Sequence, residues 1–149
     1  MELLRDLGPG PVAIDSPIFI YFIEEHAQYL PVVEPVFSAI ASGTLAAATS
    51  CLTLLEVLVQ PLRANLPALA AEYEQILGGS PGLHLVPLDP RLLRAAAYLR
   101  AATQMKTPDA IQVASALIAG CTALLTNDRR IPRVSGLRVL HARAYLHGT

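Results

Sequence analysis

Short apolar runs of strand length alternate along this chain with segments of helix length. The apolar runs predict strands at residues 12–14, 45–50, 83–88, 122–126 and 137–140. The apolar positions between them recur at helical spacing and predict helices at residues 17–25, 32–42, 53–64, 66–77, 90–103 and 109–119. Strands joined through helices need right-handed crossovers, which produce a mostly parallel sheet covered by helices on both faces. We therefore predict an α/β fold, a three-layer α/β/α sandwich around a sheet of four to five strands.

The length and composition of the chain predict one folding unit with a substantial core. Its 149 residues match a domain of ordinary size, so we expect a single domain over residues 1–149 with its core in about 12–140. Apolar residues make up 53% of the chain and charged residues only 15%, against about 25% in an average soluble chain. This balance excludes disorder. It also leaves little charge to cover the surface, which indicates a buried oligomer interface.

A mean hydropathy of +0.45 raises the question of membrane insertion. The longest uncharged stretches, residues 35–55 and 110–127, are interrupted by proline, glycine, serine or threonine, so they predict helices, turns and strands. The start of the chain, MELLRDLGPGP, carries two acids and no apolar signal-peptide region. We expect a cytoplasmic protein without a membrane segment, in which Cys51 and Cys121 are buried reduced thiols.

The net charge of −1 hides a strong asymmetry along the chain. Ten of the twelve acids lie in residues 1–90, whereas nine of the eleven basic residues lie in residues 91–149. The near-neutral sum argues against a general polyanion-binding protein. The lack of Trp and an aromatic content of 5% argue against a nucleic-acid reader built on base stacking. Neither argument excludes a local basic face formed by the last third of the chain.

Four carboxylates stand at positions where a parallel sheet places its ligand site, beyond the carboxyl ends of its strands. Asp15 closes the first predicted strand, where Ser16 is expected to cap the following helix, and Asp128 follows the fourth strand. Asp109 lies in the first turn of a helix, and Glu56 interrupts an apolar helical face. A buried carboxylate costs several kcal/mol unless it is paired or binds a metal.

Each of these acids also has a purely structural interpretation: a helix cap for Asp15, a helix-dipole partner for Asp109, a turn residue for Asp128 and an ion pair or solvent exposure for Glu56. A single cause that accounts for all four acids is a simpler interpretation than four separate structural roles. Carboxylates gathered without a basic partner repel one another and become protonated unless a hard cation neutralises them. Oxygen ligands without His or Cys at ligand spacing favour Mg²⁺, with Mn²⁺ as a substitute, over Zn²⁺.

Four segments, VAIDSPIFIYFIEE, SCLTLLEVLVQP, KTPDAIQVASALIAG and ALLTNDRRI, resemble in order and spacing the motifs of the PIN-domain family. They are similar in particular to VapC-type toxins of bacterial type II toxin–antitoxin systems, over residues 12–140. The resemblance implies that an acidic quartet binds Mg²⁺, formed by Asp15, Glu56, Asp109 and Asp128. It also implies that Ser16 and Asn127 hold the carboxylates in place.

The same resemblance implies a metal-dependent endoribonuclease that leaves a 5′-phosphate and a 3′-hydroxyl, a cognate antitoxin as inhibitor, and a homodimer. Since an acidic pocket repels RNA, nearby cations must hold the RNA backbone. The candidates are Lys106, Arg129, Arg130 and Arg133. The sequence departs from the family pattern at Pro17, where a small polar residue is usual, and at Arg130, where no further acid supports Asp128. One or two metal ions are compatible with this pattern.

Two other functions compete with the nuclease. A PIN-like scaffold that binds RNA or a protein without cutting would have the same quartet. A phospho-aspartate receiver or phosphatase would need paired acids at the first strand end and a lysine after a late strand, whereas Asp15 stands alone and the single lysine, Lys106, precedes a helix. The apolar surplus along helices such as 53–64 further predicts a dimer and a groove for an amphipathic antitoxin helix.

Overall fold

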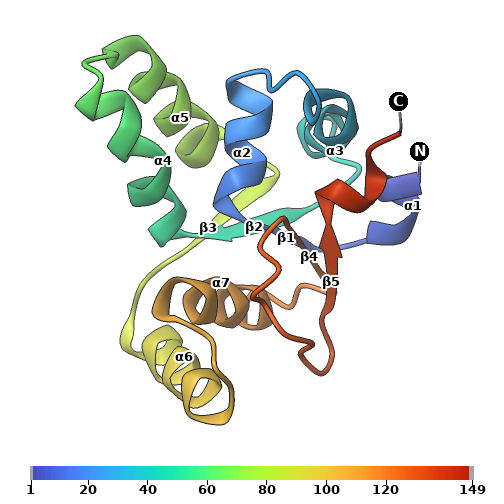
Figure 1. The fold of residues 1–149 in the computed structure, drawn as a ribbon, viewed down its shortest axis with the longest axis vertical. Coiled ribbons are helices and arrows are strands. Elements are labelled where there is room, and N and C mark those ends of the chain that lie inside the picture. Colours follow the sequence, from blue (N-terminus) through green and yellow to red (C-terminus); the bar gives the residue numbers. More distant parts are fainter. Residues whose placement is uncertain (1, 148–149) are drawn as a thin grey trace.

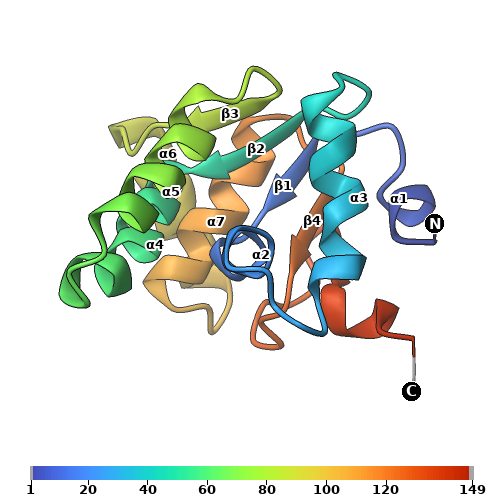
Figure 2. The ribbon, with the colours of Figure 1, turned by 90° about the horizontal axis from the view of Figure 1, so that it is seen from above.

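The computed structural model describes residues 2–147 and contains one five-stranded sheet in the order β3-β2-β1-β4-β5. The strands are β1 Val12–Ile14, β2 Ala47–Ser50, β3 Leu83–Val86, β4 Ala123–Thr126 and β5 Arg138–His141. Every neighbouring pair is parallel; Val12 of β1 lies opposite Ala47 on one side and Ala123 on the other. Figure 2 shows β3, β2, β1 and β4 side by side. The predicted α/β class and its parallel sheet are confirmed.

Helices cover both faces of the sheet and form the outer two layers of the fold. They are α1 Glu2–Leu7, α2 Ser16–Ile23, α3 Leu30–Ala41, α4 Cys51–Arg63, α5 Pro67–Gly79, α6 Pro90–Ala102, α7 Thr107–Ile118 and the 3₁₀ turn η1 Ala142–Tyr145. In Figure 1 the helices α2 to α5 lie on one side of the sheet, and α6 and α7 on the other. The sequence did not predict α1 and η1, which both pack against α3.

The core is divided into two apolar clusters by the sheet. Along β1, Val12 and Ile14 point into the cluster under α2 and α3, whereas Ala13 points toward α7. In β4, Leu125 likewise belongs to the cluster under α2 and α3, and Leu124 to the cluster on the α7 side. A strand that is buried on both faces needs apolar residues at every position, which is why these segments read as unbroken apolar runs. Within residues 2–147, no helix combines the length and apolar character needed to cross a bilayer.

Candidate functional site

A pocket of about 300 Å³ at the carboxyl edge of the sheet brings the four predicted carboxylates together. It is lined by Asp15, Ser16, Pro17, Ile20, Glu56, Pro108, Asp109, Asp128 and Arg130. Because β1 pairs with both β2 and β4, the segments that leave these strands emerge side by side. The crossover helix α7 runs back across the sheet, so its first turn reaches the same edge. Segments far apart in the sequence thus contribute to one pocket.

Asp15 is held rigidly at the floor of this pocket. Its side chain is 7% exposed and accepts hydrogen bonds from the Ser16 backbone N–H at 2.9 Å and from the Thr126 hydroxyl at 2.6 Å. The helix cap is therefore Asp15, and the expectation that Ser16 caps α2 was wrong. Burial raises the pKa of Asp15 although both hydrogen bonds oppose the shift.

Asp109 occupies the first turn of α7 and is 8% exposed. Burial, followed by the neighbouring Asp128 carboxylate, raises the pKa of Asp109 to about 6. Within the described residues, neither Asp109 nor Asp15 makes a salt bridge. Two buried acids therefore share the pocket without a bound counter-charge, which is the condition that a divalent cation relieves.

Asp128 differs from these two acids because Arg130 neutralises it. The Arg130 Nε atom donates to Oδ1 at 3.0 Å, Nη2 donates to Oδ2 at 2.9 Å, and the backbone N–H donates to Oδ1 at 2.9 Å. These hydrogen bonds lower the pKa of Asp128 to about 2. Arg130, expected at the RNA backbone, is thus engaged inside the pocket. The expectation that the carboxylates gather without a basic partner does not extend to Asp128, because the tight turn 128–130 folds the exposed Arg130 side chain back onto it.

Glu56 is half-buried on α4, and its Oε1 atom accepts a hydrogen bond from the Ser16 hydroxyl at 2.5 Å. Ser16 therefore contacts two of the four acids. Asn127 was expected to do the same but faces away: its amide N–H donates to the Tyr21 hydroxyl at 3.1 Å, and its Oδ1 accepts from the Arg143 backbone N–H at 2.9 Å. The place expected for Asn127 is taken by the residue before it.

Thr126 is that residue, and the sequence analysis missed it. Its hydroxyl donates to Asp15 Oδ2 at 2.6 Å and accepts from the backbone N–H of Asp128 at 3.0 Å, so one side chain positions two acids. A fully buried threonine at the end of an apolar strand needs a polar partner. That need was the available signal in the sequence.

A buried hydrogen-bond chain lies behind the pocket and joins the elements that carry the acids. The Gln112 amide on α7 donates to the Thr53 hydroxyl on α4 at 2.7 Å. The Thr53 and Thr49 hydroxyls are 2.8 Å apart, and Thr49 donates to the Ile14 carbonyl at 2.6 Å. Gln112 lies one turn from Asp109, and Thr53 one turn from Glu56. These hydrogen bonds therefore fix the positions of α7, α4 and β1 relative to one another.

The other basic candidates lie outside the residues that line the pocket. Lys106 is exposed immediately before α7, and Arg129 is exposed beside Asp128. Arg133 lines a separate hollow together with Arg138 and Val134. Lys106 and Arg129 thus flank two of the acids along the chain, whereas Arg133 belongs to a different part of the surface.

The donor chemistry of the pocket fits a hard divalent cation, because every acidic ligand offers only oxygen and two of the acids are buried without a counter-charge. As the side chains lie here, no three His, Cys, Asp or Glu side chains in residues 2–147 are placed to hold a metal ion together. Arg130 accounts for part of this arrangement, since it occupies both oxygens of Asp128. Coordination by the full quartet requires a side-chain rearrangement.

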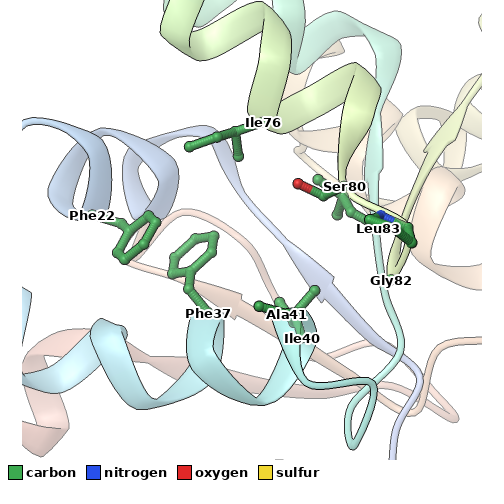
Figure 3. A pocket seen from close by; sticks show the side chains of 9 residues that line it. Phe22, Phe37, Ile40, Ala41, Ile76, Ser80, Gly82 and Leu83 are labelled. Carbon is green, nitrogen blue, oxygen red and sulfur yellow. The ribbon is translucent and has the colours of Figure 1, made fainter.

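A second hollow, which we call the apolar groove, lies between α2, α3, α5 and the start of β3. It is lined by Phe22, Phe37, Ile40, Ala41, Ile76 and residues 80–83. Its volume is about 280 Å³. Figure 3 shows the rings of Phe22 and Phe37 facing one another; they stack with centroids 4.2 Å apart. The groove is separate from the acidic pocket, with which it shares no lining residue.

Comparisons with known proteins agree with the fold described above. The family model described as "PIN domain" matches residues 12–137, whereas no curated protein sequence matches the chain. Among solved structures, VapBC2 from Rickettsia felis bound to a promoter DNA fragment superposes with a TM-score of 0.68 at 15% identity, covering 87% of this chain and 97% of that chain. DNA-bound VapBC from Salmonella typhimurium superposes with a TM-score of 0.67 at 18% identity, covering 88% of this chain and 97% of that chain. A toxin–antitoxin complex from Klebsiella pneumoniae superposes with a TM-score of 0.64 at 18% identity, covering 85% of this chain and 94% of that chain.

Proposed function

Because this chain belongs to the PIN domain family, we propose that it is a Mg²⁺-dependent endoribonuclease that acts in the cytoplasm as the toxin of a type II toxin–antitoxin module. The observation that carries the proposal is the pocket in which Asp15, Glu56, Asp109 and Asp128 meet. Fold alone does not specify activity, but four acids at the carboxyl edge of a parallel sheet are suited to phosphodiester hydrolysis with a divalent metal.

In this proposal Asp15 and Asp109 hold the better-bound ion, since they are the buried acids without a counter-charge. Glu56 and Asp128 position the attacking water or a second ion. Bound Mg²⁺, or Mn²⁺ in its place, supplies a Lewis acid that lowers the pKa of water and neutralises charge on the phosphate. Thr126 and the Ser16 backbone keep Asp15 in one orientation, and the Ser16 hydroxyl does the same for Glu56.

The RNA backbone needs positive charge at the mouth of this acidic pocket. Lys106 and Arg129 are the best-placed candidates because both are exposed and lie close in sequence to a quartet acid. Arg133 stays a more distant candidate, since the hollow that it lines does not include the quartet.

The apolar groove supports the proposal of an antitoxin partner. An amphipathic helix buries its apolar face in a groove between helices, and the solved structure from Klebsiella pneumoniae, which has a similar fold, is described as a toxin–antitoxin complex. We also propose a homodimer, because Leu55, Leu62 and Leu66 along α4 and the following turn are 48–64% exposed and would be covered by a second copy. Light scattering that shows only monomer at tens of micromolar protein would contradict the dimer.

The experiment that tests the nuclease is a cleavage assay on total and structured RNA with Mg²⁺, Mn²⁺ or EDTA. We expect metal-dependent cleavage by the wild-type protein and its loss in Asp15→Asn. Asp89→Asn is the matched control, because Asp89 caps α6 outside the pocket and Asn caps a helix equally well. Cleavage that survives Asp15→Asn would refute the site. RNA binding without cleavage would favour the non-cleaving scaffold.

A further inference from the structure

Arg130 has an unusual position, because it is the one basic residue that lines the acidic pocket within the described chain. Its guanidinium donates to both oxygens of Asp128, and its backbone N–H donates to one of them. Two parallel N–H···O bonds of this kind match the planar fork of arginine and are stronger than a single contact. A metal ion and this guanidinium therefore compete for the same lone pairs.

We propose that Arg130 is a built-in competitor of the metal: it holds Asp128 in the metal-free protein and must release this carboxylate before Asp128 can become a ligand. The inference rests on the metal site proposed above and adds a residue that regulates metal binding at that site. The competitor belongs to the same chain, so it acts in the absence of any partner. Its local concentration at the pocket is fixed by the two-residue spacing from Asp128.

The surroundings of Arg130 allow such an exchange. Its side chain is 66% exposed, whereas that of Asp128 is 17% exposed, so the guanidinium can swing into solvent without opening the core. Every side-chain hydrogen bond that Arg130 makes within residues 2–147 goes to Asp128. Once displaced, the guanidinium stays tethered at the mouth of the pocket, where an RNA phosphate would arrive. The same side chain would then serve two successive partners, first the carboxylate and then the substrate.

The quantity to measure is the Kd for the metal alone, on protein first treated with EDTA. Electron paramagnetic resonance reports the binding of Mn²⁺, and competition against Mn²⁺ gives the Kd for Mg²⁺. We expect Arg130→Ala to lower the Kd on the order of fivefold, because a positive charge and a competing ligand leave the site. Arg130→Lys keeps the charge but loses the fork, and should lower the Kd about twofold. The matched control, Arg94→Ala, removes an exposed charge on α6, outside the acidic pocket, and should leave the Kd unchanged.

Each outcome decides the proposal. Tighter binding by both Arg130 variants, with the control unchanged, supports the competition. Wild-type affinity in Arg130→Lys would overturn it, because charge alone would then account for the effect of Arg130→Ala. Unchanged binding in both variants would overturn it while leaving the metal site intact, provided that Asp15→Asn loses the metal. No binding by the wild-type protein or any variant would overturn the metal site and this inference together.

Discussion

Replacing Asp109 with Asn should stabilise the metal-free protein at neutral pH, although it removes a proposed metal ligand. The pKa of Asp109 rises from 3.8 to about 6 on folding, chiefly because of burial. This shift corresponds to a penalty of up to about 3 kcal/mol on the ionised side chain at pH 7. Solvent at the pocket mouth screens part of this penalty, so we expect a gain of about 1–2 kcal/mol in the free energy of unfolding. In a chain of this length that gain raises Tm by roughly 2–8 °C.

The gain in the free energy of unfolding should depend on pH, and the raised pKa of Asp109 determines the direction of this dependence. Above pH 6 the folded protein carries the whole penalty, because Asp109 is ionised in both states. As the pH falls from about 6 to about 4, the folded state takes up a proton first, so the difference between variant and wild type shrinks and then disappears. Asp128 acts in the opposite sense: its lowered pKa contributes stability that is lost only as the pH falls from about 4 toward 2. Burial also raises the pKa of Asp15, but Asp15 is present in both proteins, so the difference between variant and wild type from pH 4 to 8 reports on Asp109.

The assay is guanidinium unfolding at several pH values in the presence of EDTA, with Asp89→Asn as the control at an exposed helix cap. We also expect Mg²⁺ to raise the Tm of the wild-type protein and to leave that of the Asp109 variant unchanged. An Asp109→Asn protein that is less stable at pH 7.5, or a gain that does not change with pH, would refute the electrostatic argument. Retention of the Mg²⁺-dependent rise would refute Asp109 as a ligand.

Two further substitutions and one labelling experiment test the packing of the protein. Thr53→Val should lower the free energy of unfolding by about 1–3 kcal/mol, because it leaves the buried Gln112 amide without its acceptor; a neutral result in guanidinium unfolding would contradict this. Gly82→Ala should cost about 1–3 kcal/mol in the same assay, since the added Cβ would lie 2.7 Å from the Ile40 carbonyl oxygen; unchanged stability would show that the loop yields freely. Burial raises the pKa of Cys121 to about 11, so it should react with a thiol reagent at pH 8 only as fast as the protein unfolds; rapid labelling of the native protein would contradict this.

The sequence pattern was sufficient to place the strands, because the three central strands β1, β2 and β4 are buried on both faces and lie in largely apolar runs. The edge strands β3 and β5 are partly exposed. The pattern did not reveal α1, which has only six residues and whose Leu3 and Leu7 are buried by contacts with distant elements. The strand order was also beyond the sequence analysis. Which strands pair depends on contacts between segments far apart in the chain, and the local pattern carries no record of them.

The candidate site shows the same division between local and distant information. Each quartet acid stands out locally, as with Asp15 at the end of an apolar run, and the expectation that they share one edge of the sheet followed from the strand directions. The partners of the acids did not follow. Arg130 reaches Asp128 because of the turn that joins them, and Thr126 reaches Asp15 because β4 lies beside β1. Neither contact has a periodic signature.

The central position of β1 has a consequence for the synthesis of this protein on the ribosome. β1 leaves the exit tunnel before its two neighbours in the sheet, and one of them, β4, emerges only after β2 and β3. Until β4 inserts, the pocket lacks Asp128 and the hydroxyl that orients Asp15, and one edge of β1 stays unpaired. A nascent chain in which β4 has not yet been made is therefore unable to assemble the quartet. In the proposed nuclease, this strand order keeps the acidic pocket incomplete until β4 and the turn after it have been synthesised.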